Sequence, residues 1–216
     1  MLLFIRVYIA RRLIAYARYI KSLLSSKGQS SEFHYFPFDT TKPMADGAVA
    51  LMPKLCSLLE NLCVRYRITD GTVLGLYRDK GFIPHDNDID LDVLDCVNAD
   101  EIDRSMRLEG MKLGRRVSWG GKIQQLSYYD NKNIIFDLVF WYSENEQIVN
   151  YSEPGYLRAQ PRKYFIELNQ LYWLGKNYPV PESLEEWLVF RYGVDWNIPK
   201  HTKDDWKLEC HDLVRL

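Results

Sequence analysis

Aspartates recur at every second position within one short stretch of the chain, DGTVLGLYRDKGFIPHDNDIDLDVLD, residues 70–95. The repeat consists of Asp86, Asp88, Asp90 and Asp92. In a β-strand, alternate side chains project from one face about 6.6 Å apart (two rises of ~3.3 Å), so Asp88 and Asp90 would point the same way. Two such carboxylates can bind a hard cation such as Mg²⁺, which prefers oxygen ligands. Without a cation, their mutual repulsion would raise at least one pKa.

A third carboxylate for such a site can come from another strand. Asp137 is the only charged residue in the run IIFDLVFWYS, residues 134–143. A lone aspartate in an apolar strand costs several kcal/mol unless it is paired or bound to a metal. The alternative is a strand-end aspartate bonded to a turn amide or to an arginine. The sequence therefore predicts Asp88, Asp90 and Asp137 as metal ligands, with Mg²⁺ as the expected ion and Mn²⁺ as its substitute.

The segment Asp70-Gly71-Thr72 follows a predicted strand and opens a predicted helix. Gly71 would let the backbone approach a phosphate closely, the helix N-terminus offers free N–H groups, and Thr72 adds a hydroxyl. Alone this pattern is weak, because many helices begin at a threonine. Its position, with Thr72 16 residues before Asp88, makes it specific to a phosphate site beside a metal site.

Several polar side chains could reach a phosphate at this site. Arg78, on the short helix, and Lys80, in the loop that follows it, are the best placed, although salt bridges to neighbouring acids are the alternative. Lys122 and Gln124, on the strand after a Gly-Gly turn, could also reach the cleft. A later basic cluster of Arg158, Arg162 and Lys163 ranks below Arg78, because such clusters are more often solvated.

The periodicity of apolar residues predicts the elements that would carry these side chains. An apolar stripe indicates a helix over residues 45–65, with Pro53 in its first turn or at a kink. The other predicted elements are a strand at 66–69, a helix from Gly71 to Arg78, strands at 88–94, 122–129 and 133–142, and a helix at 182–193 that ends at Gly193. This order indicates an α+β domain with a mixed β-sheet flanked by helices.

The motifs together resemble the nucleotidyltransferase superfamily, which pairs a Gly-[Gly/Ser/Thr] helix start with an Asp-x-Asp strand and a third acid. The stretch GTVLGLYRDKGFIPHDNDIDLDV is similar to the central motif of the LicD/fukutin family, approximately GTLLGxxRxxGxIPWDxDxDxxV. PRKYF (161–165) and LYWLGKNYPVPESLEEWLVFRYGVDWNIP (171–199) resemble the family's closing segment. The resemblance covers roughly residues 55–200. It departs at His85, where the family usually has Trp, and His85 would lie near the donor.

The resemblance implies a magnesium-dependent phosphotransferase that moves a phospho-alcohol, such as phosphocholine from CDP-choline or ribitol phosphate from CDP-ribitol, to a glycan hydroxyl and releases CMP. Asp86 would then serve as the general base for that hydroxyl or as a further ligand, unless it only caps a turn. The acceptor would be a cell-surface or lipid-linked glycan, as in lipopolysaccharide biosynthesis. The alternatives are transfer of a nucleotide monophosphate with release of pyrophosphate, and an inactive nucleotide- or glycan-binding module.

Composition sets few further limits on the 216-residue chain. Its formal net charge of −1 gives no global field for nucleic acid, so nucleic acid is not an expected partner. Its four cysteines show no CxxC pair, which favours free thiols in a reducing compartment. Cys56 and Cys63, seven residues apart on a predicted helix, are expected to be buried on one face.

The N-terminal residues form a separate pattern. Leu2, Ile5, Ile9 and Leu13 fall at helical spacing, but arginines interrupt any apolar run long enough to cross a bilayer. This basic amphipathic helix could lie on an anionic membrane surface, or pack on its own domain or on a second subunit. We therefore expect residues 1–30 to form the helix and a Ser-rich linker and residues 31–216 to form the catalytic domain, in the cytoplasm and peripheral to the inner face of the membrane.

Overall fold

The computed structural model describes residues 29–33, 47–94, 98–132, 134–153, 155–200 and 210–215. The predicted N-terminal amphipathic helix lies outside these residues, so its expected contact with a membrane or a second subunit stays a prediction. Among the described residues, no helix is both long enough and apolar enough to cross a bilayer.

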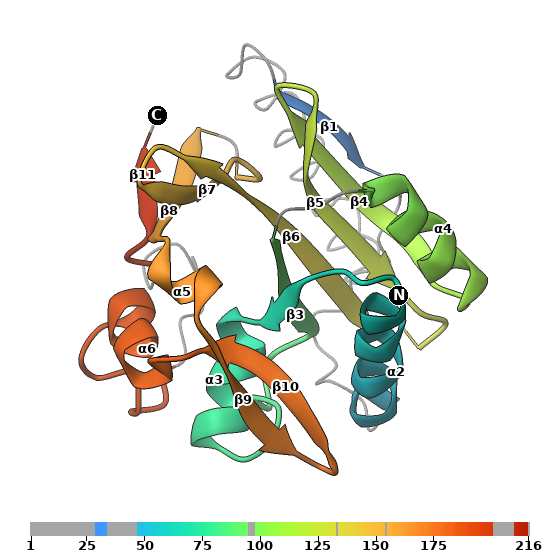
Figure 1. Cartoon of the computed structure of the whole chain (residues 1–216). Helices are drawn as coiled ribbons and strands as arrows, with labels where there is room; N and C mark the ends of the chain where they lie inside the picture. The colour runs from blue at the N-terminus through green and yellow to red at the C-terminus, as the bar shows by residue number, and fades with distance from the viewer. Residues whose placement is uncertain are drawn as a thin grey trace, which may run out of the picture.

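The described part of the chain folds around one mixed β-sheet (Figure 1). The strands of this sheet are β1 (Gln29–Phe33), β2 (Tyr66–Ile68), β3 (Asp88–Leu94), β4 (Lys112–Trp119), β5 (Lys122–Tyr129), β6 (Ile135–Glu144), β7 (Gln147–Asn150), β8 (Tyr156–Pro161) and β11 (Leu213–Arg215). Their main path is β1-β4-β5-β6-β7-β8-β11, and β3 joins it through β6. The β3–β6 pair is parallel, whereas β2 pairs with β3 antiparallel. A separate hairpin consists of β9 (Leu168–Trp173) and β10 (Lys176–Pro181).

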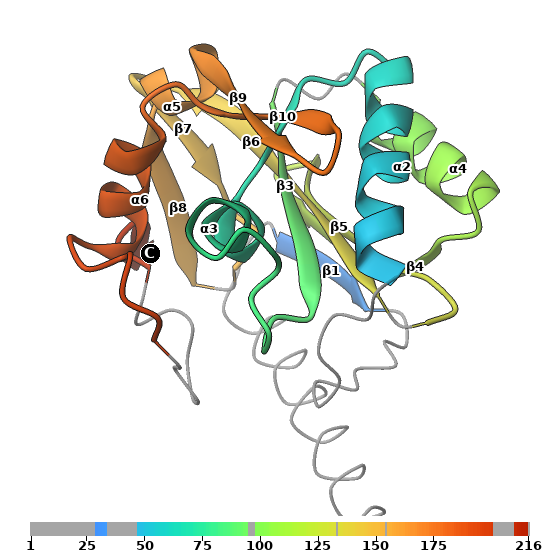
Figure 2. The same ribbon diagram turned by 90° about the horizontal axis from the view of Figure 1, so that it is seen from below.

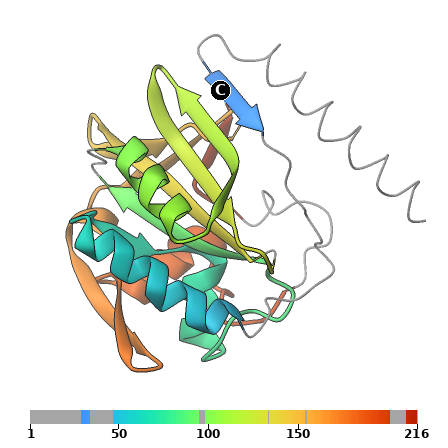
Figure 3. The same ribbon diagram turned by 90° about the vertical axis from the view of Figure 1, so that its right-hand side faces the viewer.

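Helices lie on both sides of β3 (Figure 2). The helices are α2 (Gly47–Asn61), α3 (Asp70–Arg78), α4 (Ala99–Leu108), α5 (Lys163–Ile166) and α6 (Leu184–Tyr192). In Figure 2, α2 and α4 lie on one side of β3, and α3 and α6 lie on the other. Figure 3 shows α2 and α4 running side by side across the face of the sheet.

A large part of the hydrophobic core lies between this helix pair and the sheet. Met52 and Leu55 of α2 and Met106 of α4 are fully buried in one cluster with apolar residues of β3, β5 and β6. In β3, Ile89 and Leu91 belong to this cluster, whereas the acids between them lie on the opposite face. Burial of the apolar half of β3 therefore determines the face from which its aspartates project.

Most of the predicted elements are confirmed. The structure contains the strand at 88–94 and the strand at 122–129 with the expected bounds, and a mixed sheet. The helix predicted at 182–193 is α6, and Gly193 follows its last residue with a φ of 94°, a conformation that suits glycine. Pro53 lies inside α2 beyond its first turn, which rules out the first of the two positions expected for it.

The N-terminal half differs from the expectations in two respects. Residues 29–33, which cross the predicted boundary between linker and domain at residue 30, form the edge strand β1 and pair with β4. Cys63 is exposed beyond the end of α2, and only Cys56 is buried as expected. Within the described residues, Cys56, Cys63 and Cys210 are thiols and not disulfides, which agrees with the prediction for these three.

Candidate metal and phosphate site

The three predicted metal ligands converge on one face of the sheet. Asp90 of β3 and Asp137 of β6 are direct partners in the parallel pair, and Asp88 lies two residues before Asp90. One carboxylate oxygen from each residue lies within 4.8 Å of the others. Two oxygens bound to one Mg²⁺ are at most about 4.2 Å apart, because each lies at ~2.1 Å from the ion. Small side-chain movements would therefore bring all three oxygens onto one ion.

Burial and mutual repulsion disfavour the ionised forms of the three carboxylates. Burial, followed by the charges of neighbouring carboxylates, raises the pKa values of Asp88 and Asp90 well above their ordinary range. Burial and the charge of Asp88 raise the pKa of Asp137 to about 7, although Ser127, Arg115 and Gln125 oppose this shift. A divalent cation would favour the ionised form of all three groups.

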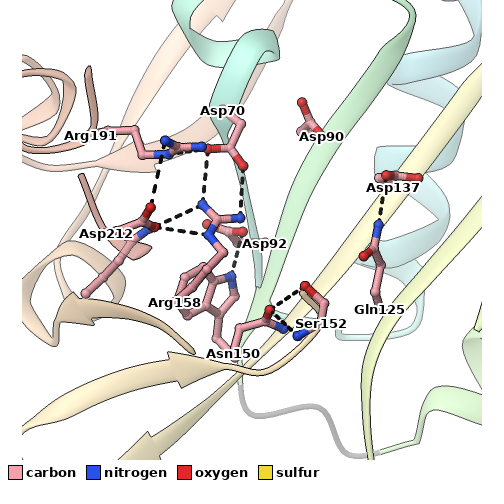
Figure 4. A network of polar contacts seen from close by, with 12 residues as sticks. Asp70, Asp90, Asp92, Gln125, Asp137, Asn150, Ser152, Arg158, Arg191 and Asp212 are labelled. Carbon is pink, nitrogen blue, oxygen red and sulfur yellow. Dashed lines mark hydrogen bonds and ion pairs between the residues drawn. The ribbon is translucent and has the colours of Figure 1, made fainter. Parts of the chain in front are cut away.

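The hydrogen bonds of Asp137 leave one of its oxygens available to a cation. Gln125 donates from Nε2 to Asp137 Oδ2 at 2.9 Å, and this bond orients the carboxylate (Figure 4). The other oxygen, Oδ1, is buried and has no hydrogen-bond partner among the described residues. A buried, unsatisfied carboxylate oxygen is costly, and coordination by a metal would remove that cost. The all-oxygen donor set is the set that Mg²⁺ and Mn²⁺ prefer.

Helix α3 is attached directly to the acidic strand. The hydroxyl oxygen of Thr72 accepts a hydrogen bond from the backbone N–H of Asp90 at 2.8 Å. A Cβ on Gly71 would lie 2.2 Å from Oδ2 of Asp86, so the carboxylate of Asp86 occupies the space that glycine leaves open. In this structure Gly71 and Thr72, which we predicted as phosphate-binding residues, contact the acids themselves.

Asp86 lies next to the three ligands. Burial raises its pKa, while hydrogen bonds with Asp88 and with the backbone N–H of Asn87 oppose the shift. Asn87 N donates to Asp86 Oδ1 at 3.1 Å. This position between Gly71 and Asp88 is compatible with either of the roles that the sequence left open for Asp86, base or further ligand.

Asp92, the last acid of the repeat, points into a different environment. It is buried and accepts hydrogen bonds from Nε and Nη2 of Arg67, at 2.9 and 2.7 Å, and from Nε1 of Trp141 at 2.6 Å. Asp92 therefore neutralises a buried arginine. This pairing distinguishes Asp92 from Asp88, Asp90 and Asp137, which form no salt bridge with the described residues.

An ion network that the sequence did not predict anchors the start of α3. It consists of Asp70, Arg158, Arg191 and Asp212, and Figure 4 shows it on the opposite side of Asp90 from Asp137. Two arginines contact the carboxylate of Asp70: Arg158 Nη1 lies 3.2 Å from it, and Arg191 Nε lies 2.7 Å from it. Arg158 Nη2 also lies 3.0 Å from the carboxylate of Asp212. Burial would raise the pKa of Asp70, but the charges of the two arginines lower it below its ordinary value. The network thus holds Asp70 ionised beneath the Gly71-Thr72 turn.

This network also corrects the expectation for Arg158. We grouped Arg158 with Arg162 and Lys163 as a basic cluster, but Arg158 is buried and compensated by aspartates. Arg162 is exposed at the start of α5, and Lys163 pairs with Glu186. The aspartates that pair with Arg158 lie 88 and 54 residues away in the sequence, so no local pattern indicated them.

The other predicted phosphate ligands have different surroundings. Arg78 forms the predicted alternative, a two-bond salt bridge to Asp79, and lies 3.4 Å from the carbonyl of Trp196. Lys80 is exposed in the loop after α3 and donates to the carbonyl of Tyr77 on that helix. His85 is exposed in the loop that precedes the acids.

On β5, the residue that contacts the acids is the neighbour of the one we predicted. Gln124 is buried, and its side-chain oxygen accepts a hydrogen bond from the backbone N–H of Tyr151 at 2.9 Å. Gln125 contacts Asp137 instead. Lys122 is exposed, with its ammonium group 4.9 Å from the ring centroid of Tyr142.

Comparison with known proteins places these features in a family. The family model described as "LicD/FKTN/FKRP, nucleotidyltransferase domain" matches residues 63–183, which is more than half of the chain. The curated protein "Ribitol-5-phosphate transferase FKTN" of Macaca fascicularis is 26% identical over 181 residues, which cover 80% of this chain and 38% of that protein. The proteins of the same name from Mus musculus and Homo sapiens are each 26% identical over 166 residues, which cover 74% of this chain and 35% of theirs. The chain thus spans little more than a third of the length of these relatives.

A solved structure shares the fold. The lincosamide antibiotic adenylyltransferase LnuA, in its lincomycin-bound crystal structure, aligns with a TM-score of 0.51 at 16% sequence identity. The alignment covers 76% of this chain and 93% of LnuA. At this identity the likeness concerns the fold, and it agrees with the predicted nucleotidyltransferase-like arrangement.

Proposed function

Because the chain belongs to the LicD/FKTN/FKRP family of nucleotidyltransferase domains, we propose that it is a phosphotransferase that moves a phospho-alcohol from a CDP-linked donor to a glycan hydroxyl. The observation that carries this proposal is the convergence of Asp88, Asp90 and Asp137 at adjacent register positions of β3 and β6. The naming of three relatives as ribitol-5-phosphate transferases supports the choice of a polyol phosphate as the group transferred.

The proposed reaction is a single displacement at phosphorus. The acceptor oxygen forms a bond to the phosphorus that bears the alcohol, and the bond from that phosphorus to the bridging oxygen breaks. CMP leaves with the electron pair of the broken bond. The proton of the acceptor hydroxyl passes to a base, for which Asp86 is our candidate because it lies beside Asp88 without belonging to the three-carboxylate set.

The residues of the chain would bind and orient the reactants. Asp88, Asp90 and Asp137 would hold Mg²⁺, with Gln125 fixing the orientation of Asp137. A Mg²⁺ ion at this position supplies positive charge that neutralises the donor diphosphate and the leaving group. The ion network and Thr72 keep α3 and the acidic strand in one arrangement.

Turnover of the purified chain tests the proposal. CDP-ribitol, CDP-glycerol and CDP-choline are each incubated with Mg²⁺ and candidate glycan acceptors, and the products are identified by mass spectrometry. We expect CMP together with a glycan that has gained a phospho-alcohol. Asp90→Asn should lower turnover at least about a hundredfold, because a metal ligand is lost. Asp100→Asn, the same change on the exposed face of α4, is the matched control.

The outcomes separate this proposal from its alternatives. Release of pyrophosphate from a nucleoside triphosphate would indicate nucleotidyl transfer in place of phospho-alcohol transfer. Full Mg²⁺-dependent activity of Asp90→Asn would show that the metal assignment is wrong. No turnover and no metal-dependent thermal stabilisation by any CDP-alcohol would count against the proposed donor class.

We further propose that the reaction takes place at the cytoplasmic face of a membrane. This rests on the basic amphipathic pattern of the first 24 residues, which is typical of helices on anionic membrane surfaces. Co-sedimentation with vesicles that contain anionic lipid should be lost when these residues are deleted. A full chain that dimerises but does not bind vesicles, and that becomes monomeric when these residues are deleted, would favour the second-subunit alternative.

A further inference from the structure

A cation, Arg115, projects from the same face of the sheet as the three predicted metal ligands. Arg115 of β4 is the direct partner of Ser127 on β5, and Ser127 is the direct partner of Asp137 on β6. Directly opposed residues of neighbouring strands project from the same face. Because Asp90 is in turn the partner of Asp137, these four residues form one row across four strands, which we call the acidic row.

The spacing of the row places Arg115 near the metal ligands. Neighbouring strands lie ~4.8 Å apart, so the Cα atom of Arg115 is about 10 Å from that of Asp137. The long side chain brings its charge closer, and this charge opposes the rise in the pKa of Asp137. Arg116, the next residue, points to the other face and bonds to Asp100 of α4 at 3.0 Å.

The guanidinium group of Arg115 is held by a well-anchored segment after β7. Its Nη2 donates to the carbonyl of Ser152 at 3.2 Å. Ser152 in turn donates from its backbone N–H and its hydroxyl to Oδ1 of Asn150, at 2.9 and 2.6 Å, as Figure 4 shows. Asn150 donates from Nδ2 to the carbonyls of Gln124 and Phe140, on β5 and β6. Two strands of the acidic row, β5 and β6, therefore also position the arginine.

The ion pair between Arg115 and Glu153 is long, so a phosphate could displace the carboxylate. Arg115 Nη2 lies 3.7 Å from the carboxylate of Glu153, whereas a charge-assisted hydrogen bond measures about 2.7–2.9 Å. The side chain of Arg115 is about a fifth exposed, whereas that of Arg158 is buried. A guanidinium group presents paired N–H donors that match two phosphate oxygens.

Charge balance on this face favours an anion at Arg115. The carboxylates of Asp86, Asp88, Asp90 and Asp137 would carry four negative charges against the two positive charges of one Mg²⁺. A donor diphosphate adds further negative charge, so its binding requires a cation within reach of the ion. Arg78 and Arg158 are already paired with aspartates.

We propose that Arg115 binds a phosphate of the nucleotide-linked donor at the end of the acidic row, beside the three-carboxylate site. This inference rests on the proposed function, because it deepens the assignment of a diphosphate donor. It makes Arg115 a residue that contributes to donor affinity through a direct contact, and it gives β4 a role in the site.

Binding measurements with Mg²⁺ test this proposal. Isothermal titration calorimetry is performed with CDP, with inorganic pyrophosphate and with cytidine on the wild type, Arg115→Gln, Arg115→Lys and the control Arg116→Gln. Losing a hydrogen-bonded charge contact should weaken CDP and pyrophosphate roughly tenfold to a hundredfold in Arg115→Gln. Arg115→Lys, which retains the charge without the paired donors, should fall between wild type and Arg115→Gln. Arg116→Gln should bind as the wild type does.

Each outcome decides for or against the contact. Equal affinities of Arg115→Gln and Arg116→Gln for both CDP and pyrophosphate would overturn the phosphate contact. A purely structural role for Arg115 predicts this result together with a lower unfolding midpoint of Arg115→Gln. Failure of both ligands to bind the wild type would also overturn the contact. Arg115-dependent binding of pyrophosphate without binding of CDP would support the phosphate contact and reject the cytidine donor. Arg115-dependent binding of CDP, followed by full turnover in Asp90→Asn, would keep the contact and reject the metal assignment.

Discussion

Replacing Asp212 by Asn should destabilise the fold strongly, although the residue lies near the end of the chain. Its carboxylate is fully enclosed, and Oδ2 accepts hydrogen bonds from Arg158 Nε at 3.1 Å and from Gln160 Nε2 at 2.8 Å. Asn keeps the shape and one acceptor oxygen but removes the charge. The two buried arginines of the ion network would then share Asp70 as their one network counter-ion.

The magnitude follows from the cost of an uncompensated buried charge. Breaking a buried ion pair by removing one partner costs about 3–5 kcal/mol, and the retained amide oxygen suggests the lower end, about 3 kcal/mol. This is a large share of a typical total of ~5–15 kcal/mol. With a urea slope of about 1.5–3 kcal/mol per molar, the unfolding midpoint should fall by about 1–2 M urea.

Equilibrium urea unfolding of Asp212→Asn, followed by circular dichroism, measures this loss. Asp195→Asn is the matched control, because Asp195 forms an ion pair with Lys200 in which both side chains are nearly half exposed. Exposed ion pairs contribute little to stability, so the control should unfold as the wild type does. Equal midpoints for the two variants, at an unchanged slope, would refute the argument that the ion network stabilises the fold.

Three further predictions concern acid stability and two glycines. The pKa values of both aspartates in the ion network lie below their ordinary range, because the arginine charges outweigh burial. Their stabilisation is therefore complete above about pH 5 and is lost as pH falls further. The difference in unfolding free energy between the wild type and Asp212→Asn should narrow as pH falls from 6 to 3, and this difference is the quantity to measure, because the raised pKa values of Asp88, Asp90 and Asp137 act in the opposite direction in both proteins. Gly75→Ala should lower the free energy of unfolding, measured with urea, by about 1–3 kcal/mol, because the new Cβ would lie 2.6 Å from the backbone carbonyl oxygen of Gly81. Gly81→Ala is the control, because a Cβ there would meet no described atom within 4 Å and the free energy of unfolding should change little. Gly71→Ala should also destabilise, and adding Asp86→Ala should recover most of the loss, since the carboxylate is what the new Cβ would overlap; strict additivity of the two changes would contradict this contact.

The central part of the site could be predicted because its signals are local. Strict alternation identified β3 and separated Asp88 and Asp90 from the apolar residues behind them. Asp137 was recognisable as the lone charge of a long apolar strand. The parallel register that places Asp137 opposite Asp90 is a property of the folded sheet, and it brings the three acids together.

The cations were harder to assign, because their partners are distant in sequence. Arg158 belongs to a basic cluster in sequence, but Asp70 of α3 and Asp212, the residue before β11, compensate it in the fold. Gln124 and Gln125 are identical in type and adjacent, so only the phase of β5 distinguishes them. The register between β4 and β5 shifts between Val117 and Ser118, opposite this pair, and such a bulge is invisible to simple alternation.

The two halves of the motif are also more closely joined than their separate chemistry suggested. Gly71 and Thr72 were assigned to phosphate and the aspartates to metal, yet Thr72 accepts a hydrogen bond from Asp90 and Gly71 makes room for Asp86. A side chain on Gly71 would displace Asp86, and the loss of the Thr72 hydroxyl would leave the Asp90 N–H unsatisfied. The distance between the helix N-terminus and the acids is therefore set by direct contacts between the two motifs. Substitutions at Gly71 or Thr72 should alter the acid cluster as well as phosphate binding.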